Sequence, residues 1–406
     1  MRRALAGLLA VLWLAPVGAS GLLAGGFAHR VWVDGAGLVW TQGDNLRGQL
    51  GNGGINRRDT PQHPLGMDQA IMVASGLDHV LVLRRDGTLW GWGYGDVGQV
   101  GATFRTPQIL DSLGLPLLSS YTIEHQPVQL ALPPIATIAA GSRHSLAVAQ
   151  DGVLYAWGAN DSGQLGLGDR FDRYLPARLS PAPPGIVQLT AGYDHSLALD
   201  GQGTLYAWGA NDSGQLGDGT QLQRTTPGVV WGLPPAQAMA AGAGFTVLVD
   251  RSGQLYTWGA NGSGQLGDGT TMTRLQPMAI PGAVDGMAVA AGRAHALGLR
   301  RDGTVWAWGA NESGQLGLGD TQSRLVPEQV LGLPAITAIA CGDGFSLAQG
   351  SDGVLYAWGN NAFMQLGPIQ DTGSLWLRPR PTQPGMLQVQ SQKQSPEPEQ
   401  EQREQP

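Results

Sequence analysis

The stretch Tyr155-Ala-Trp-Gly-Ala-Asn-Asp-Ser-Gly-Gln-Leu-Gly166 decides how this chain folds, because close copies of it recur along most of the sequence. One copy runs from Tyr206 to Gly217, and shorter matches start at Tyr256, Trp306 and Tyr356. From the first copy onwards, the Trp-Gly pair returns after 51, 50, 50 and 50 residues. A period of this length indicates a ring or an array of similar structural units.

A second landmark lies upstream of each Trp-Gly pair and keeps the same phase. It reads Ala-Gly-x-x-His-Ser-Leu-Ala in the clearest copies, and its His stands thirteen residues before the Trp. In the first unit, thirteen residues after His29, the Trp is replaced by Gln42, yet Gln49-Leu50-Gly51 follows in phase. The landmark therefore reveals seven units. In the other six, its position is held by His79, His144, His195, Phe245, His295 and Phe345.

Each unit predicts antiparallel β-strands. An Asp-Gly turn such as Asp151-Gly152 lies between two strand-like runs, which is typical of a β-hairpin. Residues on both faces of the second run are apolar, as in Val153 to Trp157, so each sheet is expected to lie between two others. Small residues at Ala139–Gly141 fit a crowded centre. The sequence thus predicts an all-β, seven-bladed β-propeller of about fifty-residue repeats.

The two ends of the chain predict how the ring closes. In a complete unit, residues 184–190 run directly into Ala191-Gly192. Residues 384–390 match the first half of this pattern, and residues 24–29 match the second half. We therefore expect one blade to be shared between N-terminal and C-terminal strands, with the propeller spanning residues 20–390.

The segments outside the repeats predict export and a disordered tail. Arg2 and Arg3 precede an apolar run over residues 4–15, and Val17-Gly18-Ala19 offers small residues for cleavage, so residues 1–19 predict a signal peptide. An uncleaved anchor is the alternative. Residues 391–406 are rich in Gln, Glu and Pro, which predicts disorder. The expected location is secreted or periplasmic, without a stable membrane span after cleavage.

The paired landmarks resemble the regulator-of-chromosome-condensation repeat family over residues 22–390. With its signal segment, the chain looks like a secreted bacterial-type member. The resemblance implies a seven-bladed propeller closed by strands from both termini. The founding member of the family exchanges guanine nucleotide on a small nuclear GTPase and binds chromatin. Other members bind proteins, and one secreted bacterial relative inhibits β-lactamases.

Composition and charge exclude several classes of function. The chain has 24 Lys and Arg against 31 Asp and Glu, a net charge of −7, so it lacks the basic field that nucleic-acid binding needs. A single cysteine, Cys341, excludes an internal disulfide and a Cys-x-x-Cys site. We interpret this thiol as a small core hydrophobe.

No residue pattern indicates catalysis, a metal or a cofactor. The recurrent His residues are far apart, and Phe replaces His in two units, which favours a packing role. The Asp-rich loops at 212–219 and 264–269 faintly resemble calcium loops, but a calcium site needs six to eight oxygens and the spacing is wrong. We interpret them as turns. The chain is expected not to be an enzyme and to hold no cofactor.

One insertion breaks the repeat and is the predicted partner-binding site. The interval from Trp92 to Trp157 is 65 residues, which places about fifteen extra residues within 104–126. Insertions of this kind often form the binding face of a repeat protein, although the loop could also fold back on its own blade. The candidate contact residues are Leu110, Leu113, Leu115, Leu117, Leu118 and Tyr121.

These observations favour a non-catalytic protein-binding propeller, secreted or periplasmic and monomeric, with a protein partner and no nucleic acid. Two alternatives stay open. One is an enzyme inhibitor similar to the secreted β-lactamase-inhibiting propeller. The other is a guanine-nucleotide exchange factor for a small GTPase.

Overall fold

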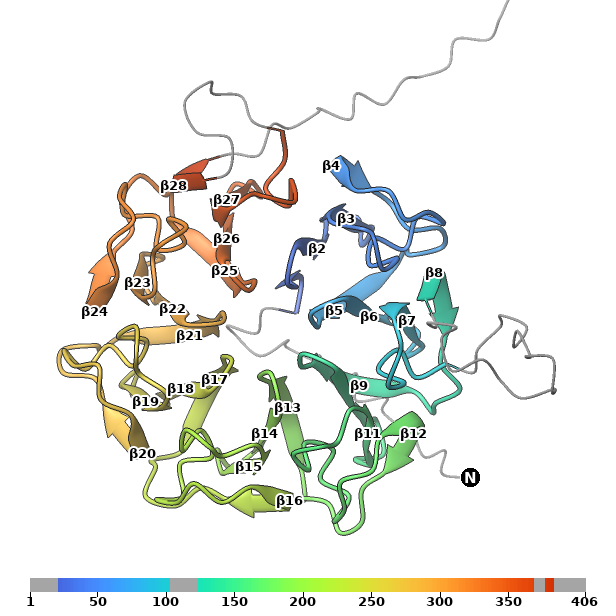
Figure 1. Cartoon of the computed structure of the whole chain (residues 1–406), viewed down its shortest axis with the longest axis horizontal. Coiled ribbons are helices and arrows are strands. Elements are labelled where there is room, and N and C mark those ends of the chain that lie inside the picture. The colour runs from blue at the N-terminus through green and yellow to red at the C-terminus, as the bar shows by residue number, and fades with distance from the viewer. Residues whose placement is uncertain (1–20, 103–122, 369–376, 383–406) are drawn as a thin grey trace, which may run out of the picture.

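The computed structural model describes residues 21–102, 123–368 and 377–382. Its strands form seven four-stranded antiparallel sheets arranged as the blades of one ring, as Figure 1 shows. We number the blades 1 to 7 in chain order. The all-β, seven-bladed propeller predicted by the repeat is confirmed, since no helix occurs among the described residues.

The four strands of each blade run outward from the centre in chain order. The innermost strands are β1 (Leu23–Gly25), β5 (Ala70–Ser75), β9 (Ile135–Ala140), β13 (Ile186–Ala191), β17 (Ala236–Ala241), β21 (Gly286–Ala291) and β25 (Ile336–Cys341). The second strands are β2 (His29–Val33), β6 (His79–Arg84), β10 (His144–Ala149), β14 (His195–Asp200), β18 (Phe245–Asp250), β22 (His295–Arg300) and β26 (Phe345–Gly350). The third strands are β3 (Val39–Gly43), β7 (Leu89–Tyr94), β11 (Leu154–Gly158), β15 (Leu205–Gly209), β19 (Leu255–Gly259), β23 (Val305–Gly309) and β27 (Leu355–Asn360). The outermost strands are β4 (Arg58–Gln62), β8 (Ile123–Gln129), β12 (Arg173–Arg178), β16 (Arg224–Val229), β20 (Arg274–Ala279), β24 (Arg324–Gln329) and β28 (Leu377–Thr382).

The thirteen-residue interval between the landmarks is the register of a hairpin. In blade 3, His144 lies opposite Gly158 and Ser145 lies opposite Trp157. The turn between these strands forms because the Asp151 carboxylate accepts the Val153 amide at 3.0 Å. The same spacing in the other blades therefore produces the same pairing.

The signature Trp residues join each blade to the one before it. All six are fully buried. In blade 3, Trp157 Nε1 donates to the carbonyl of Gln99 in blade 2 at 2.9 Å. The other five signature Trp residues form the same hydrogen bond, in which the indole nitrogen donates to the carbonyl of the Gln in the preceding blade. The contact explains the recurrence of the Trp. The Gln side chain has a separate role, because its Oε1 accepts an amide of its own loop, as Gln164 does from Ser162 at 2.9 Å.

Blade 1 replaces the Trp with a buried polar pair. Gln42 occupies the Trp position, and Arg30, which is 2% exposed, occupies the position of Ser145 in blade 3. The Arg30 Nε donates to Gln42 Oε1 at 3.1 Å, and its guanidinium lies 4.9 Å from the centre of the Trp32 ring. The phase that the sequence assigned to this degenerate unit is confirmed.

Each outermost strand contains a proline, which has no amide to offer a further strand. The edge of every blade is therefore blocked against pairing with another molecule. The prolines are Pro61, Pro127, Pro176, Pro227, Pro277 and Pro327, together with Pro379 and Pro381 of β28.

The described strands differ from the expected shared blade. Blade 1 takes all four strands from residues 23–62, because Leu23–Gly25 already pairs with β2 as the innermost strand. The carbonyl of Leu22 extends this ladder by accepting the Val33 amide at 2.9 Å. Blade 7 ends with β28, and residues 384–390 lie outside the described residues.

Blade 7 meets blade 1 through backbone contacts at the centre. The Asp343 amide donates to the Gly26 carbonyl at 3.1 Å. This bond belongs to a head-to-tail series linking the loops after the innermost strands: Phe27 to Leu77, Leu77 to Ser142, Ser142 to Tyr193, Ala243 to Arg293, and Arg293 to Asp343. Leu23 also packs in one cluster with Phe345 and Leu347.

Alternating strand direction gives the disc two different faces. The loop face carries the loops that join first to second strands and third to fourth strands. The turn face carries the tight turns between second and third strands and the connections from one blade to the next. Each candidate site below lies on one of these faces or in the channel between them.

A small apolar cavity between blades 5 and 6 gives a first prediction. It measures about 20 Å³ and is lined by Gly298, Leu255 and Trp308. An added Cβ at Gly298 would lie 3.4 Å from Trp308 and 3.6 Å from Leu255, which is ordinary contact. Gly298→Ala, which copies Ala198 of blade 4, should raise the free energy of unfolding by about 1 kcal/mol. Urea unfolding of both proteins measures this, and a lower midpoint would contradict it.

Candidate functional site

A central channel of about 240 Å³ passes between the innermost strands. Its wall is mostly Ala and Gly, which confirms the crowded centre predicted at Ala139–Gly141. Cys341 ends β25, lines this channel in a half-buried position and packs against a core cluster, in line with its expected role as a small hydrophobic residue. Tyr193 donates a hydrogen bond to the Asp343 carboxylate across the loop-face end of the channel, from blade 4 to blade 7. Burial, and then this carboxylate, raise the pKa of Tyr193.

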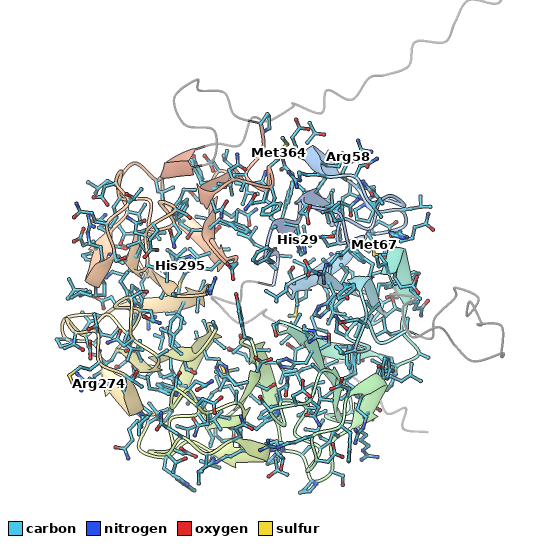
Figure 2. The ribbon with its side chains drawn as sticks, viewed as in Figure 1. His29, Arg58, Met67, Arg274, His295 and Met364 are labelled. Atoms are coloured by element: carbon cyan, nitrogen blue, oxygen red, sulfur yellow. The ribbon has the colours of Figure 1, made fainter. Side chains whose placement is uncertain are left out.

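The recurrent His residues join neighbouring blades. The Nε2 atom of His144 lies 2.9 Å from Ser196 Oγ in the next blade, and Ser196 donates to the carbonyl of Gln164 at 2.7 Å. Because that hydroxyl already donates its proton, it accepts the proton on Nε2 of His144. Figure 2 shows His29 and His295 in the inner part of the disc, well inside Arg58 and Arg274 at its edge. The predicted packing role is confirmed.

The Phe unit of blade 5 follows the same rule in apolar form. His195 contacts Thr246, whereas Phe245 packs in one cluster with Ala296 of the next blade. A hydroxyl at the equivalent position of the next blade contacts the His of blades 2, 3, 4 and 6, whereas His29 of blade 1 contacts Ser75 of β5. Phe245 instead packs with the methyl group of Ala296. For blades 2 to 6, the landmark His or Phe and the residue that it contacts in the next blade are therefore either both polar or both apolar.

These imidazoles are kept neutral by their surroundings. Burial is the main cause that lowers the pKa of His29, His79 and His144 to about 3, and that of His195 and His295 to about 4. Such groups act as neutral hydrogen-bond partners at neutral pH, so they are poorly suited to proton transfer there.

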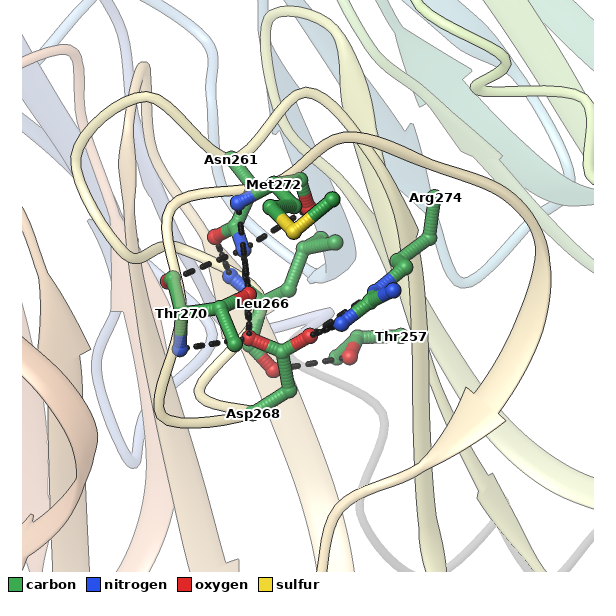
Figure 3. Close-up of polar contacts among 7 residues, drawn as sticks. All are labelled: Thr257, Asn261, Leu266, Asp268, Thr270, Met272 and Arg274. Atoms are coloured by element: carbon green, nitrogen blue, oxygen red, sulfur yellow. Dashed lines mark hydrogen bonds and ion pairs between the residues drawn. The ribbon is translucent and has the colours of Figure 1, made fainter.

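The Asp-rich loops are held by side-chain hydrogen bonds, as Figure 3 shows for blade 5. The Asn261 amide nitrogen donates to the carbonyls of Thr270 and Met272, both at 3.0 Å. Its oxygen accepts the Leu266 amide at 3.0 Å. One Asn therefore fixes both ends of the loop, and we call this arrangement the Asn clamp.

The carboxylate in this loop is occupied by protein groups. Asp268 accepts hydrogen bonds from the amide and hydroxyl of Thr270 at 2.9 and 2.7 Å, and pairs with Arg274 at 2.9 Å. Asp218 and Arg224 repeat the pair in blade 4 at 2.9 Å. These aspartates are thus part of the loop scaffold, in line with the turn interpretation. Among the described residues, no group of three His, Cys, Asp or Glu could hold a metal ion.

Blade 2 differs from the other blades at the Asn clamp. Gly95 stands where the clamp residue is expected. The same loop, between β7 and β8, contains the insertion. The other six blades hold Asn at this position, namely Asn45, Asn160, Asn211, Asn261, Asn311 and Asn361.

The predicted contact residues in the insertion lie outside the described residues. These are Leu110, Leu113, Leu115, Leu117, Leu118 and Tyr121. The expected C-terminal boundary of the insertion is corrected, because residues 123–126 already belong to β8. The flanking strands place both attachment points of the insertion on the loop face of blade 2.

A group of acidic residues that sequence reasoning missed lies on the loop face of blades 3 and 4. We call Asp161, Asp172, Asp194 and Asp212 the acidic patch. Burial raises the pKa of Asp194, and the nearby carboxylates of Asp161 and Asp212 raise it further. Burial, and then Asp161, also raise the pKa of Asp172.

The acidic patch lacks the ion pairs that several neighbouring carboxylates form. None of its four members forms an ion pair within the described part of the chain, whereas neighbouring aspartates pair with arginines, as Asp96 does with Arg143 at 2.7 Å. Asp161 and Asp212 are exposed. The patch therefore keeps its negative charge available to a partner.

Comparison with known proteins identifies the family. A family model described as an RCC1-like domain matches residues 20–285. The chain is an RCC1-family propeller. Models of the RCC1 repeat also match residues 302–349, and residues 288–315 and 336–365. The resemblance seen in the two landmarks is thereby confirmed.

The relatives of this RCC1-family propeller include proteins with different roles. It is 32% identical over 250 residues to the ultraviolet-B receptor UVR8 of Arabidopsis thaliana, covering 51% of this chain and 57% of UVR8. It is 28% identical over 230 residues to an RCC2 homolog of Danio rerio, covering 50% of this chain and 44% of that protein. The chain thus matches about half the length of these relatives.

Solved structures agree with the fold. Prp20p of Saccharomyces cerevisiae, described with its binding properties to Gsp1p and histones, has a TM-score of 0.72 and 25% identity, covering 88% of each chain. Yeast RCC1 bound to Kap60 gives a TM-score of 0.74 at 22% identity, covering 92% of this chain and 86% of the other. Within the described residues, no helix is long and apolar enough to cross a membrane.

Proposed function

We propose that this RCC1-family propeller is a non-catalytic protein-binding module that works outside the cytoplasm, secreted or periplasmic. Its partner docks on the loop face of blades 2 to 4, where the insertion is attached and the acidic patch lies. The observation that carries this proposal is the exception at Gly95, where the Asn clamp is missing in the blade that bears the insertion.

The blade that bears the insertion lacks the side-chain hydrogen bonds of the Asn clamp. In six blades, the clamp Asn accepts an amide at the start of the loop and donates to carbonyls further on, so loop length and shape are constrained. Gly95 has no side chain to make these bonds. The Asn that closes the other loops is therefore absent from the blade that carries the insertion, and insertions of this kind often form the binding face of a repeat protein.

The acidic patch gives the expected chemistry of the partner. Exposed carboxylates that form no ion pair, such as Asp161 and Asp212, favour a partner surface rich in Lys or Arg. Prp20p, which shares the fold, has been studied for binding to histones and to Gsp1p. We therefore expect a basic protein or a basic segment, with binding that weakens as salt rises.

Affinity capture with the purified full chain tests this function. Deletion of residues 108–122 should abolish capture of the partner. D161N/D212N should weaken binding about tenfold at low salt, because each exposed charge contributes up to about 1 kcal/mol. D151N/D352N is the matched control, since it removes two charges from the turn face and Asn still accepts the turn hydrogen bond. Equal capture by all four proteins would contradict the proposal.

The location is tested separately. Export should leave a mature N-terminus near residue 20, and mass spectrometry of culture fluid and periplasm measures it. An intact Met1 on cytosolic protein would contradict the extracellular location. A captured hydrolase, such as a β-lactamase, would support the inhibitor alternative.

Guanine-nucleotide exchange is the second candidate, because the likeness to Prp20p covers most of the chain and Gsp1p is named as its binding partner. This function predicts that the propeller accelerates release of labelled GDP from a small GTPase. Unchanged release across a panel of such GTPases would leave protein binding without exchange.

A further inference from the structure

Three connections on the turn face present apolar residues to solvent. Each of these residues is followed by a glycine with positive φ, which turns the chain sharply: the pairs are Leu65-Gly66, Trp231-Gly232 and Leu331-Gly332. The side chains of Leu65, Trp231 and Leu331 are 81%, 80% and 73% exposed. We call these three residues the apolar tips.

The fold itself does not require apolar tips. In blade 4, the preceding residue Val230 is 4% exposed and fills the core, and Trp231 then projects outward. Blade 3 makes the same step from the buried Leu179 to Ser180. A polar residue is therefore compatible with this position, and the exposed Trp231 needs another explanation.

The positions of the tips point to a flat partner. They are structurally equivalent residues of blades 1, 4 and 6, so they project from the same face of one rigid ring and on well-separated sides of its axis. A pocket on a protein would contact one tip, whereas a wide, flat surface that takes up apolar side chains can contact all three at once. Trp and Leu are residues that favour the boundary between water and lipid.

The chain also enters the propeller at the turn face. The Gly21 carbonyl accepts the Val73 amide at 2.6 Å, and the Leu22 carbonyl accepts the amide of Val33, which directly precedes a tight turn of this face. Residue 21, where the described part of the chain begins, therefore lies at the face that carries the apolar tips.

We propose that the turn face rests on a lipid bilayer through Leu65, Trp231 and Leu331. Arginines and aspartates are mixed on this face, as in Arg84 paired with Asp68 at 2.7 Å, so the contact depends on the apolar tips and needs no anionic lipid. The opposite loop face stays open to solvent. This inference is independent of the proposed protein partner.

Fluorescence quenching by lipid tests the contact in the full chain. Phosphatidylcholine vesicles with brominated acyl chains quench a Trp that reaches the bilayer. The contribution of Trp231 is the difference in quenching between the wild type and W231F, a subtraction that removes any signal from the other tryptophans. We expect a clear difference. Equal quenching of the two proteins would overturn the proposal, even if another part of the chain binds the vesicles.

Matched variants show whether the tips act together. L65S/L331S should reduce the Trp231 contribution at least twofold, because it removes the other two points of contact. F171S/L222S/M272S alters three loop residues that are 74%, 73% and 63% exposed, and should leave the contribution unchanged. An equal loss in both variants would overturn the proposed geometry. Near-UV circular dichroism confirms that each variant is folded.

Discussion

Acidification from pH 8 to pH 5 is expected to unfold this propeller, with a loss on the order of 10 kcal/mol in the free energy of unfolding. Burial lowers the pKa of five histidines to about 3 or 4 from the ordinary 6.5. A loss of this size is comparable with the whole stability of a typical domain. The expected transition therefore lies well above the pH at which most carboxylates titrate.

The direction of the effect follows from where the protons bind. Between pH 6.5 and 4, the unfolded chain protonates these histidines, whereas the folded protein keeps them neutral. The unfolded state thus binds more protons, and stability falls as the pH falls. At pH 5 the difference approaches five protons, a slope of about 6 kcal/mol per pH unit. Above about pH 7.5 these groups contribute no pH dependence.

Thermal melts followed by near-UV circular dichroism at pH 8, 6.5, 5.5 and 5 measure the loss. The chain itself suggests the control: H295F/S346A copies the Phe245 and Ala296 pair of the neighbouring interface. This variant should lose about one fifth of the slope and unfold at a lower pH. A melting temperature that is constant from pH 8 to 5, or an unchanged slope in the variant, would contradict the account.

The sequence predicts the role of these histidines, but it leaves their partners unidentified. Replacement of His by Phe in two units indicates packing, because a ligand position would not accept a benzyl ring. The hydroxyl that contacts His144 is Ser196, fifty-two residues away in the next blade. Patterns within one unit cannot reveal a contact between units until the curvature of the ring is known.

Closure of the ring is the clearest difference between expectation and structure. Residues 384–390 resemble the start of an innermost strand, yet blade 1 already has β1 at that place. The two segments match successive halves of one pattern, and such a match cannot show which segment supplies the strand that pairs with β2. Hydrogen bonding decides the outcome, since Leu22 and Leu23 extend the ladder from the N-terminal side.

Only part of the candidate site can be predicted from the sequence. The insertion is visible as an interval of 65 residues, and the loss of the clamp is visible as Gly95 at an Asn position. The acidic patch is different, because Asp161, Asp194 and Asp212 come from separate loops that only the fold brings near one another. Their charges look scattered along the chain and become a surface feature only on the ring.

The glycine of the second landmark gives the other large effect: Gly192→Ala should lower the free energy of unfolding by about 3 kcal/mol or more. Its φ is not in the left-handed region, so the constraint is space. An added Cβ would lie 2.3 Å from the Gly242 carbonyl oxygen of the next blade and equally close to the His195 ring. Neither the backbone of the adjoining blade nor a fully buried imidazole can move away easily.

The same contact occurs around the channel, where the Cβ of each glycine but the last would meet the carbonyl of the next one. These glycines are Gly26, Gly76, Gly141, Gly192, Gly242, Gly292 and Gly342. The close approach between the backbones of these glycines determines the distance between neighbouring blades at the channel. A methyl group at one position must therefore push two blades apart, which also disturbs the Trp and His contacts between them.

Gly262→Ala is the matched control for this prediction. Gly262 lies in a loop of the same repeat, has open space around its Cβ position, and is replaced by Asp161, Asp212 and Glu312 in other units. Its substitution should change stability by less than about 0.5 kcal/mol. Urea unfolding at pH 8 compares the two variants with the wild type. If Gly192→Ala is as stable as Gly262→Ala, the landmark glycine does not set blade spacing, and the recurrence of Ala-Gly-x-x-His must have another cause.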